Sequence, residues 1–99
     1  MAKGYWITFY RSVSDDAALA RYASLAAPAI VAGGGRILAR GKAAKSYEAG
    51  LAQRVVLVEF ASVASAVAAY ESPQYQAALA VLGNTAERDL RIVEASPDT

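Results

Sequence analysis

Arg54-Val55-Val56-Leu57-Val58-Glu59-Phe60 is the stretch that decides the fold, because it reads as a β-strand that is apolar on both of its faces. Successive residues of a strand point to opposite sides of a sheet, so the residues of this strand fall into two sets. These sets are Val56, Val58 and Phe60 on one face, and Val55, Leu57 and Glu59 on the other. Neither set is typical of a face that water covers.

The second apolar face needs a cover that the chain itself is too short to provide. An antiparallel sheet usually packs one face against the core and leaves the other solvated. The sequence predicts only two helical regions, and these can cover a single face. We therefore expect a second copy of the chain to close the other face, giving a homodimer packed sheet against sheet.

Length and charge narrow the classes of partner. The 99 residues suit one domain with one modest core, and we take residues 1–99 as a single domain whose core spans about 4–95. Ten basic and nine acidic residues leave a formal charge of +1, too small to create the field that nucleic acid or anionic membranes require. Neither nucleic acid nor membrane is expected as a partner.

The chain lacks both cysteine and histidine, which restricts the chemistry it can perform. Without cysteine it has no disulfide, no thiolate nucleophile and no thiolate metal site. Without histidine it lacks the usual acid or base at neutral pH and the commonest metal ligand. We expect no metal and no cofactor. The start of the chain lacks the apolar core of a signal peptide, which favours a soluble cytoplasmic protein.

Apolar patterns and breaker residues divide the chain into six elements. Strands are expected where aromatic and β-branched residues cluster, and helices where a serine cap precedes an apolar stripe at helical spacing. The expected strands are 5–11, 36–40, 54–60 and 89–95, and the expected helices begin at Ser14, at Ser62 and again at the Ser72-Pro73 pair. The order βαββαβ is that of the ferredoxin-like fold, an α+β fold with a four-stranded antiparallel sheet and helices on one face.

Three segments modify this plan. Pro28 should kink or restart the first helix, and the glycines at 33–35 should end it. The second helical region should restart at residues 72–73, with serine as the cap and proline in the first turn. Residues 42–53 are polar and weakly patterned, so they read as a loop or a short extension of a strand.

Several short motifs are distributed over nearly the whole chain. They are Gly4-Tyr5-Trp6, Gly34-Gly35-Arg36, Ala39-Arg40-Gly41, Glu48, the strand 54–60, the Tyr-Glu-Ser-Pro-Gln-Tyr run at 70–75 and Ile92-Val93-Glu94. Together they resemble the domain-of-unknown-function family 1330. Each motif alone is weak, whereas the combination is specific.

The resemblance implies the dimeric α/β barrel superfamily, in which two ferredoxin-like subunits pack sheet against sheet and a cleft remains between each sheet and its helices or loops. Relatives in that superfamily include cofactor-independent monooxygenases, muconolactone isomerases and haem-dependent chlorite dismutases, so the fold alone does not choose an activity. The absence of histidine removes the haem-dependent relatives. Residues 42–53 depart most from the family pattern, because only Glu48 and Gly50 echo the expected Glu-Gly.

Glu59 is the strongest candidate for a catalytic residue. A carboxylate within an apolar strand must be paired, solvated through a cleft or kept protonated, and such a group could act as a general base. The alternative is an ion pair with Arg36, Arg40 or Arg91 that fixes strand register or the dimer interface.

Two arginines of the second strand are candidate ligand-binding residues. Arg36 and Arg40 alternate with apolar residues, so both should project from one face and could hold a carboxylate or phosphate. Charges on an exposed strand edge would look the same, since they prevent unwanted strand pairing. Arg54 is ambiguous, because it starts its strand and would also suit a position facing water.

Aromatic residues reach both faces of the first strand. Trp6, Thr8 and Tyr10 share one face, and Tyr5, Ile7 and Phe9 share the other. One set must face a partner or a pocket, and packing explains it more simply than a stacking site. Near the helix restart, Tyr70, Ser72 and Tyr75 surround free backbone N–H groups that could meet an anion, although a plain serine cap explains this motif too.

Three functional hypotheses remain open. The first is a soluble homodimer that binds a small organic molecule, without cofactor or metal, in a cleft lined by Trp6, Tyr10, Arg36, Arg40 and Glu59. The second is a cofactor-independent isomerase or monooxygenase in the same cleft, with Glu59 as base and an arginine stabilising the developing oxyanion. The third is a purely structural dimer, which predicts that the cleft has no ligand.

Overall fold

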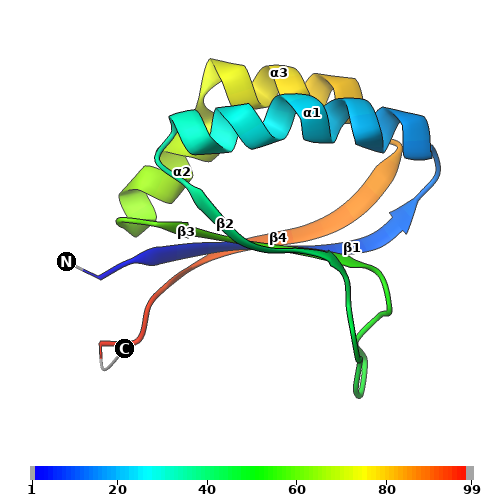
Figure 1. The fold of residues 1–99 in the computed structure, drawn as a ribbon, viewed down its shortest axis with the longest axis horizontal. Helices are drawn as coiled ribbons and strands as arrows, with labels where there is room; N and C mark the ends of the chain where they lie inside the picture. The colour runs from blue at the N-terminus through cyan, green and yellow to red at the C-terminus, as the bar shows by residue number, and fades with distance from the viewer. Residues whose placement is uncertain (1, 98–99) are drawn as a thin grey trace.

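Four strands form one antiparallel sheet with three helices above one of its faces in the computed structural model, which describes residues 2–97 (Figure 1). The elements in chain order are β1 Gly4–Val13, α1 Asp16–Ala32, β2 Arg36–Lys42, β3 Arg54–Phe60, α2 Val63–Glu71, α3 Pro73–Leu82 and β4 Ala86–Glu94. The strand order across the sheet is β2-β3-β1-β4. The predicted α+β ferredoxin-like fold is therefore confirmed.

The core lies between the helices and the sheet face that carries Val58 and Phe60. Trp6 stacks on Phe60 with ring centroids 5.9 Å apart, and the ring of Tyr75 meets Trp6 edge-on at 4.9 Å. Alanines of the three helices fill much of the remaining contact, which lets the helices lie close to the sheet. The part of the covered face around these rings is a dry aromatic core.

The other face of the sheet has no helix over it (Figure 1). Val55 and Leu57 lie on this face, and their neighbours on β1 across the sheet are Phe9 and Ile7. The exposed fraction of Phe9 is 43%, and that of Val93 on β4 is 50%. The apolar character that the sequence predicted for both faces of β3 thus corresponds to one covered face and one open face.

A β-bulge in β2 changes which side chains face the helices. Ile37 lies opposite Val58 of β3, but the next paired residue is Ala39, opposite Leu57, so Leu38 is an extra residue. An extra residue reverses the alternation of the side chains that follow it. Residues before and after the bulge therefore reach faces that simple alternation does not predict.

The ends of α1 differ in detail from the prediction. Asp15, not Ser14, is the cap, since its carboxylate accepts a hydrogen bond from the N–H of Ala18 at 3.1 Å. Ser14 instead donates its hydroxyl to the carbonyl of Thr85, also at 3.1 Å. The helix runs unbroken through Pro28, so the predicted restart does not occur.

No helix in the described part of the chain is long and apolar enough to span a bilayer.

The segment between β2 and β3 forms an arm that extends from the sheet on the side opposite the helices (Figure 1). β2 continues as far as Lys42, and the N–H of Ala43 still donates to the carbonyl of Gln53 at 3.0 Å. Tyr47 and Gly50 close the tip through a backbone hydrogen bond of 2.9 Å. The sequence left a loop and a short strand extension as alternatives for residues 42–53, and the structure contains both.

The restart between α2 and α3 positions Tyr75 in the core. Ser72 accepts a hydrogen bond from the N–H of Tyr75 at 3.2 Å and donates one to the carbonyl of Ala69 at 2.8 Å. Pro73 occupies the first turn of α3, where its missing N–H costs nothing. The predicted serine cap is confirmed.

We expect Ser72→Ala to lower the free energy of unfolding by about 1 kcal/mol, because the first turn of α3 loses its side-chain cap. Ser24→Ala is the matched control. The hydroxyl of Ser24 is exposed and donates only to the carbonyl of Arg21 within the same helix, so its loss should change stability by less than about 0.5 kcal/mol. Urea denaturation of both variants measures the difference, and equal losses would contradict the role of the cap.

Candidate functional site

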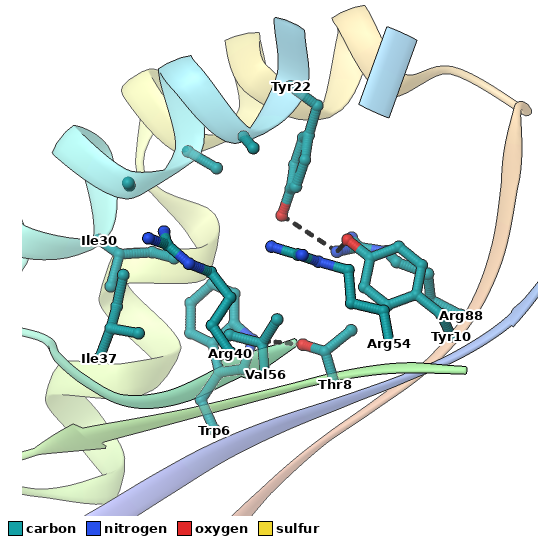
Figure 2. Close-up of a pocket in the computed structure, with 13 residues that line it drawn as sticks. Trp6, Thr8, Tyr10, Tyr22, Ile30, Ile37, Arg40, Arg54, Val56 and Arg88 are labelled. Atoms are coloured by element: carbon teal, nitrogen blue, oxygen red, sulfur yellow. Dashed lines mark hydrogen bonds between the residues drawn. The ribbon is translucent and has the colours of Figure 1, made fainter. Parts of the chain in front are cut away.

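A half-open pocket lies between α1 and the covered face of the sheet (Figure 2). Its empty space totals about 380 Å³ including the mouth, but only about 30 Å³ is open to the centre of a water molecule. The volume of about 30 Å³ describes the pocket better, because long side chains reach into it. A ligand larger than a few atoms would therefore have to move some of these side chains.

The polar lining of the pocket comes from all four strands and from α1. These side chains are Trp6, Thr8 and Tyr10 of β1, Tyr22 of α1, Arg40 of β2, Arg54 of β3 and Arg88 of β4. Ile30, Ile37 and Val56 provide an apolar wall. Strand pairing explains the convergence, since Arg40 lies opposite Val56, and Val56 lies opposite Thr8 in the same row of the sheet.

Arg88 is held by a cluster of tyrosines. Its Nη1 donates to the hydroxyl of Tyr22 at 3.0 Å, with longer and weaker contacts to Tyr10 at 3.5 Å and, from Nη2, to Tyr75 at 3.4 Å. The hydroxyls of Tyr22 and Tyr75 are hydrogen-bonded to each other at 2.5 Å. The guanidinium carbon also lies 5.1 Å from the ring centroid of Tyr22. All of these hydrogen-bond partners are neutral phenols.

The electrostatics of this cluster keep Arg88 charged and the phenols neutral. Burial raises the pKa of Tyr22 and of Tyr75 above the ordinary value of 10. Burial by itself would lower the pKa of Arg88, but the oxygens of Tyr22 and Tyr75 outweigh it and the pKa rises above its usual value. At neutral pH the cluster therefore carries a half-buried positive charge, with which no carboxylate of residues 2–97 forms an ion pair.

Arg54 adds a second cation beside the cluster. Its guanidinium carbon lies 5.9 Å from the ring centroid of Tyr10, and that of Arg88 lies 5.5 Å from the same ring. The Nε of Arg54 is buried and has no hydrogen-bond partner within residues 2–97. Figure 2 shows its guanidinium reaching into the pocket below Tyr22. This N–H is an unsatisfied donor in the wall of the pocket.

The polar groups of the pocket are matched to an anion. Thr8 accepts a hydrogen bond from the indole N–H of Trp6 at 2.9 Å, so its own hydroxyl hydrogen remains available. Every polar side chain of the described lining can donate a hydrogen bond, and none is a carboxylate. Nor do the described residues bring together three carboxylates that could bind a metal ion. The pocket can stabilise negative charge by charge-assisted hydrogen bonds.

Only part of the predicted site is assembled here. Trp6, Tyr10 and Arg40 line the pocket as the sequence predicted. Arg36 does not, because the bulge at Leu38 places it opposite Glu59 on the open face, whereas Arg40 faces the helices. The prediction that Arg36 and Arg40 share a face is therefore wrong.

Glu59 lies on the open face of the sheet, away from the pocket. Its carboxylate accepts hydrogen bonds from the ammonium of Lys3 at 3.3 Å and from the hydroxyl of Tyr5 at 3.4 Å. An ion pair was a correct alternative, but the predicted partners Arg36, Arg40 and Arg91 were wrong. Strand register explains this, since Tyr5 is the direct neighbour of Glu59 on β1 and brings Lys3 near it.

The residues at the helix restart serve the core. Tyr70 packs against Trp6 with centroids 5.6 Å apart and against Tyr75 at 5.2 Å, and Ser72 caps α3. None of the three lines the pocket. Tyr75 nevertheless supports the site indirectly, because its hydroxyl holds Tyr22 and Arg88 in place.

Sequence reasoning missed Arg88 as a site residue. The predicted final strand begins at residue 89, whereas β4 begins at Ala86. Arg88 shares the covered face with Leu90 and Ile92, which lie opposite Thr8 and Trp6. Continuing that alternation two residues back, from Leu90 to Arg88, would have predicted an arginine on a buried face.

One protein family matches nearly the whole chain. Residues 3–96 match the model of the family described as "Domain of unknown function (DUF1330)". No curated protein matches the chain.

Solved structures share the fold at low sequence identity. A protein of unknown function from Rhodopseudomonas palustris has a TM-score of 0.71 at 17% identity, over 96% of this chain and 83% of that one. A dimeric ferredoxin-like protein of unknown function from Thermobifida fusca has a TM-score of 0.68 at 16% identity, over 95% and 92% of the two chains. A proposed antibiotic biosynthesis monooxygenase from Caulobacter crescentus has a TM-score of 0.59 at 17% identity, over 96% and 90%. These similarities show the fold alone.

The raised pKa values of Tyr22 and Tyr75 predict a loss of stability at alkaline pH. Below about pH 10 both phenols are protonated whether the chain is folded or unfolded, so they contribute no pH dependence. Above that pH the unfolded chain releases these protons while the folded chain retains them, so the free energy of unfolding should fall as pH rises. Tyr22→Phe should reduce this slope. Urea denaturation between about pH 8 and about pH 12 tests the expectation, and identical slopes for the two proteins would contradict it.

Proposed function

The chain belongs to the DUF1330 family, and we propose that it acts as a homodimer in which each subunit binds a small organic anion in the pocket between α1 and the sheet. One observation carries the proposal. The side chains around the pocket include the cations Arg54 and Arg88, each of its polar side chains can donate a hydrogen bond, and the described lining residues include no carboxylate.

A half-buried cation without a counterion is costly for the folded protein. Removing a charge from water carries a penalty that neutral hydroxyls offset only in part. A carboxylate in the pocket would offset this penalty through charge-assisted hydrogen bonds. The wall formed by Ile30, Ile37 and Val56 suits the carbon skeleton that such an anion would carry.

The same geometry gives less support to catalysis. A general base must lie within hydrogen-bonding reach of the proton that it removes. Among the described lining residues, Tyr22 is a phenol that is protonated at neutral pH, burial raises its pKa further, and the arginines are cations. Glu59, the base that the sequence suggested, lies on the opposite face of the sheet and contacts Lys3 and Tyr5. We therefore place binding ahead of turnover.

The open face of the sheet supports the homodimer. It presents partly exposed apolar residues, and a second copy would cover them by the same surface, as a two-fold interface requires. The Thermobifida fusca protein of the same fold is described as dimeric. A purely structural dimer would need this face but would not explain why hydrogen-bond donors gather in the pocket.

Benzoate is the first probe for the pocket, with benzamide as its neutral match. We expect benzoate to bind saturably, as measured by chemical-shift titration of the amide resonances, and benzamide to bind far more weakly. Arg54→Met should weaken benzoate binding by about tenfold, because one charge-assisted hydrogen bond is lost. Arg36→Met is the control, since Arg36 lies on the other face. Equal binding of benzoate and benzamide, or equal losses in the two variants, would refute the anion site.

Leu57→Arg tests the homodimer. Leu57 lies in the middle of the open face, opposite Ile7, so a charge there should prevent a second sheet from packing against it. Val31→Arg places the same charge on α1, at a residue whose exposed fraction is 61%. Sedimentation equilibrium should find a dimer for the wild type and for Val31→Arg, and a monomer for Leu57→Arg. A monomeric wild type would refute the proposal.

A further inference from the structure

The three arginines of the pocket reach it from three different strands. Arg40 lies on β2, Arg54 on β3 and Arg88 on β4, while β1 runs between the last two. Neighbouring strands are about 4.8 Å apart, so the backbones at Arg40 and Arg88 are separated by roughly 14 Å across the sheet. Arg54 lies on the strand next to that of Arg40, so only Arg40 and Arg88 are separated by the full width of the sheet.

Arg88 has little capacity left for a ligand. Its two terminal nitrogens already face the hydroxyls of Tyr10, Tyr22 and Tyr75. Its function in the site is that of a fixed positive charge, and it also orients Tyr22. If Tyr75 donates to Tyr22 within their hydrogen bond, the hydroxyl hydrogen of Tyr22 is free to point into the pocket.

Arg54 is free to contact a ligand directly. Its Nε has no hydrogen-bond partner within the described residues, and its guanidinium shares the ring of Tyr10 with that of Arg88. Two cations on one aromatic ring repel each other, and one carboxylate placed beside them would relieve this repulsion. The Arg54–Arg88 pair thus forms the first of two cationic positions.

Arg40 forms the second cationic position. It lines the pocket from the edge strand, and within residues 2–97 it makes no ion pair. In Figure 2 its guanidinium lies beside Ile30, and the guanidinium of Arg54 lies between it and Tyr10. A carboxylate already held by Arg54 and Arg88 would leave Arg40 without a counterion.

We infer that the ligand is a small dicarboxylate, one end of which binds Arg54 beside Arg88 while the other end binds Arg40 at the mouth of the pocket. This inference rests on the proposed function and specifies its ligand class. The carbon chain between the two carboxylates would lie along Val56, which is opposite Arg40 in the sheet and two residues from Arg54 on β3.

Succinate and butyrate are the probes that test the second carboxylate. Both have a four-carbon chain, and they differ by a carboxylate in place of a methyl group. We expect succinate to bind the wild-type protein about tenfold more tightly than butyrate, measured by the same chemical-shift titration, because Arg40 adds a charge-assisted hydrogen bond. Methyl phosphate, a dianion with one charged group, should bind more weakly than succinate.

Arg40→Met identifies the residue that recognises the second carboxylate. Arg40 is exposed, so its replacement should leave the fold intact. In this variant we expect succinate to lose its advantage of about tenfold, while butyrate binds as it does to the wild type. A retained preference for succinate in Arg40→Met would overturn the assignment of Arg40.

The outcomes separate this inference from the function on which it rests. Equal affinities of succinate and butyrate for the wild type would overturn the dicarboxylate and leave the anion pocket intact. Tighter binding of methyl phosphate than of succinate would also overturn it, in favour of one dianionic group. Failure of every anion to bind, benzoate included, would refute the anion pocket itself.

Discussion

One layer of helices covers one face of the sheet, and the rest of the structure depends on this one-sided cover. Because strand residues alternate between the two faces, each is committed either to the helices or to the open side. Beneath α2 and α3 the covered face is filled by aromatic rings around Trp6, whereas beneath α1 it holds Arg54 and Arg88. The hydroxyls of the tyrosines replace part of the water that Arg88 loses. A dry core and a charged pocket therefore share one face of the sheet.

Most of the fold could be predicted because its signals are local. The two apolar faces of residues 54–60, the glycines at 33–35 and the Ser72-Pro73 pair each act within a few residues, and each is found where expected. The cap of α1 shows where local reasoning ends. Ser14 and Asp15 are both good caps, and the choice falls on Asp15 because Ser14 hydrogen-bonds to a carbonyl near the start of β4. A contact between segments so distant in the chain has no signal in the sequence.

The candidate site was less predictable, because it depends on side-chain direction over several strands. One extra residue, Leu38, places Arg36 and Arg40 on opposite faces of the sheet. No breaker residue in the sequence marks that bulge. Arg88 was hidden for a different reason. A cation beside an acidic residue in a final strand resembles an exposed face, and only the pairing of β4 with β1 shows that it lies with Leu90 under the helices. Strand order and register, which sequence patterns do not specify, decided both cases.

A pocket that contains cations and no carboxylate among its described lining residues favours some activities over others. Such a lining stabilises the charged form of an acid relative to its neutral form, so it selects a ligand that is already ionised in water. Enzymes that generate an anion from a neutral substrate need, in addition, an acceptor for the departing proton. Glu59 cannot be that acceptor within one subunit, since the backbone of the sheet separates it from Tyr10 and Arg88, and Lys3 already neutralises it. Within one subunit, the described lining residues include no carboxylate that could accept such a proton.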